Sequence, residues 1–435
     1  MNPFKEKALA IGSGLTSFCE MYPKPYNKRE VDPYTKTRII LMNGTEFEAN
    51  WFSHQLARHT DNNDLRRDIA LARAEEKQQQ LKISLLKPPS ETVLEHTIGY
   101  EQLAVDLTAE LAKNECDCNV KRALDFALLE DFDHLYRYAD LLEMEQGVRA
   151  EYLVGRYTEI MPARPTIAHH RYPLDNVRLP ISAKASSTRT VLNTMIITAA
   201  EQQTMNYYMN VTAFASSDIA RRLYQEIALV EEEHVTHYEA LMDPNATWLE
   251  MLLWHEYCEC YLYWSCIKTE TDDCIRKLWE ECLNTEIAHL HGAARLLEKY
   301  EKKEAAEVIP DAEFPEPLSL HENIEYVRDV LANTVQFTSL HDNNYARVEA
   351  LPENADFFRY QRTIHPSVDS TPSHNVIECY LRHHRTDYRY EVAENPIPAL
   401  RCRREDNTEV GRVPGAAPSP CGFKCNGDDT CDCDK

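Results

Sequence analysis

The sequence predicts an all-α fold, with two tandem four-helix bundles followed by a largely irregular C-terminal extension. Three observations support this prediction. The 435 residues include only 11 glycines and few of the alternating apolar runs that half-buried β-strands require. Long segments instead carry apolar residues at helical spacing. A pattern of acidic residues and histidines also recurs at a constant offset, Glu46 and Glu201 being 155 residues apart.

Turn-forming residues separate the predicted helices. Lys87 to Glu91 contains two prolines, which end one helix, and offers Ser90 as the N-cap of the next; Asp243 to Asn245 separates a later pair. An N-terminal extension at 1–35 precedes a first bundle at 36–146, and a second bundle follows at 188–303. The helices are expected near residues 36–59, 62–86, 91–114, 119–146, 188–215, 217–242, 246–268 and 271–303.

The segments outside the bundles have less regular patterns. Residues 147–187 contain several prolines and are interpreted as a linker or an ordered strap. The extension at 304–435 is expected to hold short helices at 318–335 and 374–390 and to wrap over the bundles or remain partly disordered. Its cysteine-rich end matches no defined zinc motif, so metal binding and a disordered acidic tail both stay open. The cysteines concerned are Cys421, Cys425, Cys431 and Cys433.

Composition argues against several classes of function. The net charge of −24 and pI near 5.2 do not fit a nucleic-acid surface, which needs clustered Lys and Arg. No apolar stretch approaches the roughly 20 residues that cross a bilayer, and the N-terminus lacks the apolar core of a secretion signal. Most of the 14 cysteines stand singly in helical patterns, as reduced thiols do. We expect a cytoplasmic protein with no nucleic-acid or membrane partner, and homo-oligomerisation stays open.

An internal repeat places acids and histidines at matching positions. In the second half, Glu201 and Glu231 are 30 residues apart, and so are Glu256 and Glu286. The second acid of each pair begins a Glu-x-x-His motif, so the six positions are Glu201, Glu231, His234, Glu256, Glu286 and His289. The same positions in the first half are Glu46, Glu76, Gln79, Glu101, Asp131 and His134. A tandem duplication of a four-helix unit explains this series.

The spacing of the second-half set is what a two-metal site needs. Residues at i and i+3 share a helix face, so each Glu-x-x-His presents a carboxylate and an imidazole to one point. Thirty residues span half a helix, a turn and half of the next helix, which brings paired acids opposite each other. Four carboxylates and two imidazoles are the ligand set of di-iron and di-manganese bundles. Without cations, so many buried acids would be costly unless protonated.

The first-half set departs from this pattern. Asp131 is one methylene shorter than glutamate, and Gln79 supplies a neutral amide where the second half has an imidazole. Whether this half forms a second metal site or a structural copy is left open. The neighbouring His237, His255 and His291 are expected to support the ligands or face solvent. Tyr207, Tyr208 and Tyr238 are expected to pack in the core, and a radical or hydrogen-bonding role near the metals is the alternative.

On these Glu and Glu-x-x-His pairs, about 105 residues of each half resemble the ferritin-like superfamily, and within it the rubrerythrin-like (erythrin) branch. The resemblance implies two iron ions, or manganese, that react with peroxide or dioxygen, with electrons from an unknown donor. It also makes Glu259 an additional candidate ligand. The chain departs by lacking a rubredoxin-like pair of Cys-x-x-Cys knuckles. The short connection from Glu231 to Glu256 permits an up-down-up-down bundle, or exchange of helical hairpins between halves or subunits.

Three functions follow from this resemblance. The first is a di-iron oxidoreductase, either a peroxidase or an oxidase. The second is a ferroxidase or iron-storage protein with no organic substrate. The third is a di-metal oxygenase acting on an unknown small molecule, with the C-terminal extension forming a lid or pocket.

Overall fold

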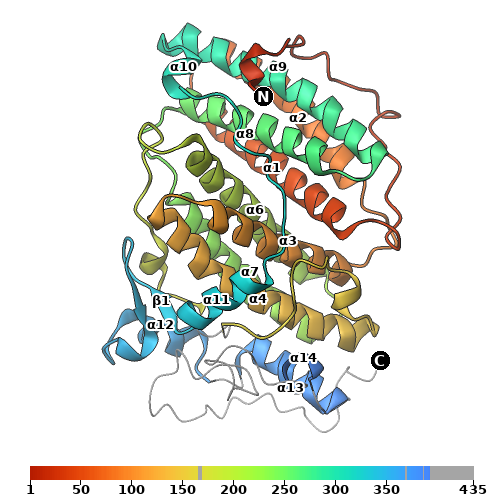
Figure 1. Ribbon diagram of the computed structural model, residues 1–435, viewed down its shortest axis with the longest axis vertical. Helices are drawn as coiled ribbons and strands as arrows, with labels where there is room; N and C mark the ends of the chain where they lie inside the picture. Colours follow the sequence, from red (N-terminus) through yellow and green to blue (C-terminus); the bar gives the residue numbers. More distant parts are fainter. Residues whose placement is uncertain (165–168, 368–369, 386, 392–435) are drawn as a thin grey trace. The chain divides into compact units, whose positions relative to one another are not determined.

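The computed structural model describes residues 1–164, 169–367, 370–385 and 387–391 (Figure 1). The four cysteines of the C-terminal tail lie outside the described residues. Within them the protein is mostly helical, which confirms the all-α prediction. The long helices are α1 (Pro33–Arg58), α2 (Asn63–Ser84), α3 (Val93–Asn114), α4 (Cys118–Gln146), α6 (Thr188–Phe214), α7 (Asp218–Glu239), α8 (Trp248–Thr269) and α9 (Asp273–Glu301).

Each long helix lies within a few residues of its predicted range, but the predicted cap of α3 is wrong. Thr92, not Ser90, is the N-cap, because Thr92 has a reciprocal partner one turn on. Its hydroxyl accepts a hydrogen bond from Glu95 N at 3.2 Å, and Glu95 accepts one from Thr92 N at 2.8 Å. Thr247 and Glu250 form the same capping box at the start of α8, with the same two distances. The repeat therefore extends to the capping residues.

Shorter elements make the C-terminal region more regular than the sequence pattern suggests. Phe357 and Phe358 of α12 pack against Val348, which builds a small separate core. A nine-residue helix and a hairpin of two three-residue strands are too short for sequence periodicity to reveal. The short elements of the C-terminal region are α10 (Ala305–Val308), α11 (Ile324–Thr334), the antiparallel pair β1 (Phe337–Ser339) and β2 (Tyr345–Arg347), η4 (Val348–Ala350), α12 (Asp356–Ile364), α13 (Pro372–His384) and α14 (Tyr388–Glu391). Three short 3-10 helices lie earlier in the chain: η1 (Pro3–Lys5), η2 (Ala150–Tyr152) and η3 (Pro173–Asn176).

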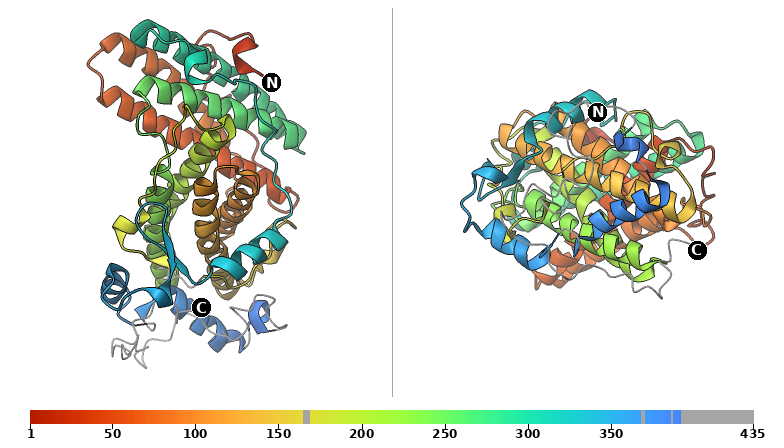
Figure 2. Two further views of the ribbon diagram at one scale, coloured as in Figure 1. Left: turned by 60° about the vertical axis from the view of Figure 1, so that its left-hand side comes forward. Right: turned by 90° about the horizontal axis from the view of Figure 1, so that it is seen from below.

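The helices belong to two compact units. Unit 1 comprises Met1–Glu91, Pro180–Gln203 and Met242–Leu320, and unit 2 comprises Thr92–Leu179, Thr204–Leu241 and His321–Lys435. In unit 1, α1 packs against α2 and α8, and α9 packs against α2 and α8, so these four helices lie side by side (Figures 1 and 2). In unit 2, α4 packs against α3, α7, α11 and α13. The boundary falls within α6.

This division differs from the predicted order of two consecutive bundles at 36–146 and 188–303. The first-half hairpin α1–α2 packs with the second-half hairpin α8–α9, and the first-half hairpin α3–α4 packs with α7. The structure thus has hairpins exchanged between the two halves, which the sequence left open. The internal repeat gives α3–α4 and α8–α9 acids and histidines at matching positions, so this spacing does not select which hairpin packs with α1–α2. Local sequence therefore does not determine the pairing.

Two expectations from composition can be compared with the structure. No helix in the described part of the chain is both long enough and apolar enough to cross a membrane. Of the five helix cysteines expected to be reduced thiols, Cys258, Cys260, Cys266 and Cys282 are buried and Cys274 is exposed, and all five are free in the structure. Burial raises the pKa of Cys258 and Cys260 well above the usual range, so these thiols stay protonated.

Candidate metal centres

The exchange of hairpins regroups the predicted ligands into one cluster in each unit. The six ligands that the sequence places in one second-half site are therefore divided between the units. Glu201 is buried on α6, just before the point where this helix passes from unit 1 into unit 2. Cluster A, in unit 1, contains Glu46, Glu76, Gln79, Glu256, Glu259, Glu286 and His289. Cluster B, in unit 2, contains Glu101, Asp131, His134, Glu231 and His234.

Cluster A lies among α1, α2, α8 and α9, and its ligand atoms converge. His289 Nδ1 is 3.2 Å from Glu286 Oε2, and 3.8 Å from both Glu76 Oε1 and Glu256 Oε2. Glu76, Glu256 and His289 each offer one atom within 4.8 Å of the others, and so do Glu256, Glu259 and Glu286. All of these side chains are buried. Glu256 belongs to both groups, which suits a carboxylate that bridges two ions.

The carboxylates of cluster A lack the donors that buried oxygens need. Within the described residues, Glu46 Oε2, Glu76 Oε2, Glu256 Oε2 and both oxygens of Glu259 have no hydrogen-bond partner. Burial raises the pKa of Glu76 to about 7, and burial together with the neighbouring Glu286 raises the pKa of Glu46 and Glu259 well above the usual range. Cations would satisfy these oxygens and allow the acids to ionise, so the donor set fits a metal pair.

Gln79 occupies the cluster A position where the repeat has a histidine. Its amide nitrogen donates to Glu286 Oε1 and, at 3.3 Å, to Glu46 Oε1. Tyr263 donates its hydroxyl to the same oxygen of Glu46. The amide therefore acts as a neutral donor to two candidate ligands, and His289 is the single imidazole on this cluster's ligand positions.

A buried acid outside the predicted set orients His289. Glu75 Oε2 lies 3.1 Å from His289 Nε2, which leaves Nδ1 directed at the cluster. Glu75 also accepts hydrogen bonds from Gly12 N at 2.7 Å and Gly14 N at 2.6 Å. Burial opposes ionisation of Glu75, but the hydrogen bonds from His289, Gly12 and Gly14 lower its pKa. The N-terminal segment approaches this closely because Gly12 has a φ of +94° and a Cβ on Gly14 would lie 2.8 Å from Glu75 Oε1.

Cluster B brings two imidazoles to the carboxylates of α3, α4 and α7. His134 Nδ1 is 3.1 Å from Glu231 Oε1, and His234 Nδ1 is 3.3 Å from Glu231 Oε2 and 3.2 Å from Asp131 Oδ1. Glu101 joins His134 and Glu231 in a second group of ligand atoms within 4.8 Å of one another. The rings of His134 and His234 are 6.1 Å apart. Glu231 therefore lies between two histidines, as a bridging carboxylate would.

Cluster B has the same kind of supporting acid as cluster A. His234 Nε2 lies 2.6 Å from Glu130 Oε2, and Arg171 Nη1 donates to Glu130 Oε1 at 2.5 Å. Burial opposes ionisation of Glu130, but Arg171 and His234 hold its pKa well below the usual range. Despite its burial, Glu231 has its pKa lowered to about 2 by hydrogen bonds from His134 and His234. A carboxylate–histidine pair that directs the other ring nitrogen inward is typical of metal sites.

Sequence reasoning missed both supporting acids, although a signal for them exists. Glu75 and Glu130 each directly precede a predicted ligand, Glu76 and Asp131. Consecutive helical positions differ by about 100°, so the preceding acid faces the neighbouring helix instead of the cluster. Two adjacent acids at such a position therefore indicate that the second acid is a candidate metal ligand. The first acid then supports a histidine ligand on the neighbouring helix. His169, buried with its ring 5.5 Å from that of His134, was also missed.

The other predicted neighbours are not among the converging ligand atoms. His255 Nδ1 donates to Met251 O at 2.8 Å, and His255 Nε2 lies 2.8 Å from Glu48 Oε2. His291 Nε2 lies 3.2 Å from Pro3 O. His237 stacks on Phe126. The tyrosines differ, because Tyr208 donates its hydroxyl to Glu101 Oε1 at 2.5 Å. Tyr208 and Tyr238 are both buried, which confirms that they pack in the core, and a role of Tyr208 near bound metals stays a prediction.

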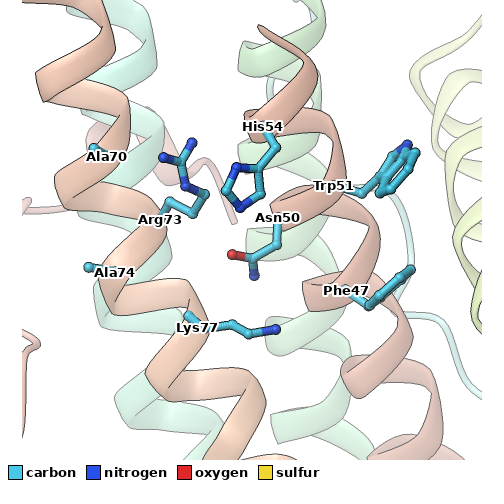
Figure 3. A pocket seen from close by; sticks show the side chains of 8 residues that line it. All are labelled: Phe47, Asn50, Trp51, His54, Ala70, Arg73, Ala74 and Lys77. Carbon is cyan, nitrogen blue, oxygen red and sulfur yellow. The ribbon is translucent and has the colours of Figure 1, made fainter. Parts of the chain in front are cut away.

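A surface pocket lies beside cluster A between α1 and α2. Its volume is about 330 Å³, and His54 from α1 and Arg73 from α2 point toward each other across it (Figure 3). Asn50, Arg73 and Lys77 line it within about one turn of Glu46 and Glu76, and Asn50 donates to Glu46 O at 2.8 Å. The pocket therefore carries basic side chains and lies within about one helical turn of Glu46 and Glu76, neither of which lines it.

No protein-family model, curated protein or solved structure matches this chain. The geometry of the two clusters is therefore the basis for the functional conclusion.

Proposed function

We propose that this chain is a di-metal carboxylate oxidoreductase of the rubrerythrin-like, ferritin-like type, with one metal pair in each cluster. The observation that carries the proposal is the arrangement around His289 and His234. Each imidazole has one nitrogen fixed by a buried acid, Glu75 or Glu130, and the other directed at several carboxylates. A buried ion pair alone does not need so many acids around one imidazole.

The charge in each cluster supports two divalent ions. Cluster A has carboxylates from Glu46, Glu76, Glu256, Glu259 and Glu286, which offset the +4 charge of a metal pair. Cluster B has Glu101, Asp131 and Glu231, and the repeat pairs Glu201 with Glu231 as a further candidate. Iron or manganese suits this oxygen and nitrogen donor set.

Bound iron would supply the redox chemistry that reacts with peroxide or dioxygen. The residues of the chain have the other roles. Glu75 and Glu130 orient the histidines, and burial excludes water from the ligands. Tyr263 and Tyr208 each hold a proton on a hydroxyl that donates to a candidate ligand, Glu46 or Glu101. These hydroxyls are placed to stabilise negative charge at the clusters or to supply a proton.

The pocket beside cluster A suits a small polar substrate. Arg73 and Lys77 supply positive charge, and Arg73 lies one turn before Glu76 on α2. A hydroperoxide or a small anion would be attracted to this opening. Its size is close to the lower limit of small-molecule sites.

Metal analysis with matched variants tests the proposal. We expect about two iron or manganese ions in each cluster, and so about four in the two clusters together. Glu231→Ala should remove the pair in cluster B, and Glu256→Ala the pair in cluster A. The exposed neighbours Glu232 and Glu281 provide the controls Glu232→Ala and Glu281→Ala, which should keep all ions.

Activity separates the candidate functions. The iron-loaded protein should consume peroxide faster than either ligand variant. Iron uptake continuing well beyond two ions per cluster would instead support the ferroxidase or storage alternative. Protein that binds no iron or manganese, or ligand variants that bind as much as the controls, would refute the proposal.

A further inference from the structure

A third group of buried ligand atoms lies in unit 2, away from the residues of cluster B. It consists of His170, which precedes η3, Glu226 on α7 and His365, which follows α12. Their exposed fractions are 3%, 5% and 8%. None of the three belongs to the internal repeat, and neither the di-metal clusters nor the pocket uses them.

The three side chains direct one atom each at a common point. Glu226 Oε1 lies 3.8 Å from His170 Nε2 and 3.8 Å from His365 Nε2, and the two imidazole rings are 4.6 Å apart. A separation of 3.8 Å is too long for a hydrogen bond. Ligands bound to one ion at about 2.1 Å are separated by roughly 3.4 Å in tetrahedral geometry. Both carboxylate-to-imidazole separations therefore need to shorten by only a few tenths of an ångström for these atoms to bind one ion.

These converging atoms have nothing else to bind. In the part of the chain that the structure describes, His170 Nε2, Glu226 Oε1 and His365 Nε2 all lack a hydrogen-bond partner. Their remaining polar atoms, by contrast, all face a polar group. His170 Nδ1 is 3.6 Å from Glu233 Oε1, His365 Nδ1 is 3.2 Å from Thr371 Oγ1, and Glu226 Oε2 accepts from Ser373 N at 2.7 Å.

This outer set of contacts is what metal-binding histidines have. A hydrogen-bonded group at Nδ1, as Thr371 is for His365, leaves the Nε2 lone pair directed at the ion, and the carboxylate of Glu233 lies on the Nδ1 side of His170. Thr371 is the N-cap of α13 and Ser373 lies in its first turn. The supporting groups therefore come largely from the start of one helix, which also packs against α7.

A simple ion pair explains the group less well than a cation does. Although burial opposes it, Glu226 and Glu233 raise the pKa of His170 to about 9, so a protonated His170 would pair with Glu226. Burial and the charge on His170 lower the pKa of His365 to about 3. His365 would then stay neutral with a buried nitrogen lacking a donor. A divalent cation satisfies all three atoms at once.

We propose that His170, Glu226 and His365 bind one divalent transition-metal ion and thereby fasten the C-terminal extension to α7. Two imidazoles and one carboxylate are a ligand set shared by Zn²⁺ and Fe²⁺ sites, and they leave at least one position for water. The ion joins three segments of unit 2 that are far apart in the sequence. It is separate from the di-metal proposal, because none of its ligands belongs to cluster A or cluster B.

Metal stoichiometry in matched variants tests this site. Full-length protein is stripped of metal and reloaded with Zn²⁺ or with Fe²⁺ in separate experiments. His365→Ala should bind one ion fewer per chain than wild type with the metal that occupies the site. His374→Ala is the control, because His374 is a second buried histidine of the same region whose Nε2 faces the half-exposed Glu378 at 3.1 Å. It should bind as much metal as wild type.

A second variant covers the case in which His365→Ala fails to fold. His365→Cys places a thiolate at the same point, and loading with Co²⁺ should give a sulfur-to-cobalt absorption band that wild type lacks. The ion should also protect the segment around α12 and α13 from proteolysis, and a chelator should remove that protection in wild type. Equal stoichiometry in wild type and folded His365→Ala, or a His365→Cys variant without the cobalt band, would overturn the proposal.

Discussion

Replacing Glu75 with glutamine tests whether this acid orients His289 for metal binding. Glu75 Oε2 faces both His289 Nε2 and Gly12 N, and Oε1 accepts from Gly14 N. Glutamine has one acceptor oxygen where glutamate has two. In either amide orientation, its NH2 group therefore faces a backbone N–H or the imidazole N–H, and the negative charge that polarises the imidazole is lost.

The size of the effect follows from what such supporting groups do in known metal sites. Their loss typically weakens metal affinity about 10- to 100-fold, which is about 1.4 to 2.7 kcal/mol. Only cluster A should be affected, since cluster B relies on Glu130 and Arg171. The measurement is a competition titration of metal-stripped protein against a chromophoric chelator. A Glu231→Ala background removes the contribution of cluster B.

Two results would contradict this reasoning. One is a change in affinity of less than about threefold for folded Glu75→Gln, since that falls below the expected range. The other is an equal loss for Glu281→Gln, which makes the same change of charge on the exposed face of α9. Circular dichroism of the metal-free proteins checks that each variant is folded.

Three further predictions concern unit 1 and α3. Gln79→His should strengthen metal binding at cluster A, measured by the same titration, because an imidazole replaces an amide that donates to Glu46 and Glu286. Arg73→Ala should raise the KM for hydroperoxide several-fold with little change in kcat, because Arg73 lines the pocket. Burial raises the pKa of Asp106 to about 7 from 3.8, so its contribution to the free energy of unfolding is complete below pH 4 and is lost as pH rises through 7. Asp106→Asn should abolish this loss, which is on the order of a few kcal/mol, in urea unfolding at pH 5 and pH 8.

Much of the helical structure was predictable because helix formation depends on local pattern. Apolar spacing located the long helices, and the i, i+3 rule located the candidate ligands on them. The N-cap of α3 was also available locally, since Thr92 and Glu95 form a recognisable capping box that Ser90 cannot. The prolines at 88 and 89 indicate where the preceding helix ends, but they do not identify the residue that caps the next helix.

The pairing of helices was not available from local pattern. The repeat offers α1–α2 two hairpins whose candidate ligands have the same spacing, and the structure pairs it with α8–α9. Site residues outside the repeat were hidden for a related reason. His170, Glu226 and His365 come from three segments with no fixed spacing, so no motif connects them until the chain is folded.

The exchange of hairpins changes what the sequence differences between the two halves mean. In consecutive bundles, Gln79 and Asp131 would both weaken the first centre and leave the second intact. In the exchanged arrangement Gln79 lies in cluster A and Asp131 in cluster B, so each centre combines one hairpin from each half. Cluster B thereby gains both His134 and His234, while cluster A keeps His289 and an excess of carboxylates. Imidazole-rich sites favour iron, and carboxylate-rich sites also suit manganese. Under the proposed function, the two clusters therefore differ in ligand chemistry, and the departures Gln79 and Asp131 do not both fall in one of them.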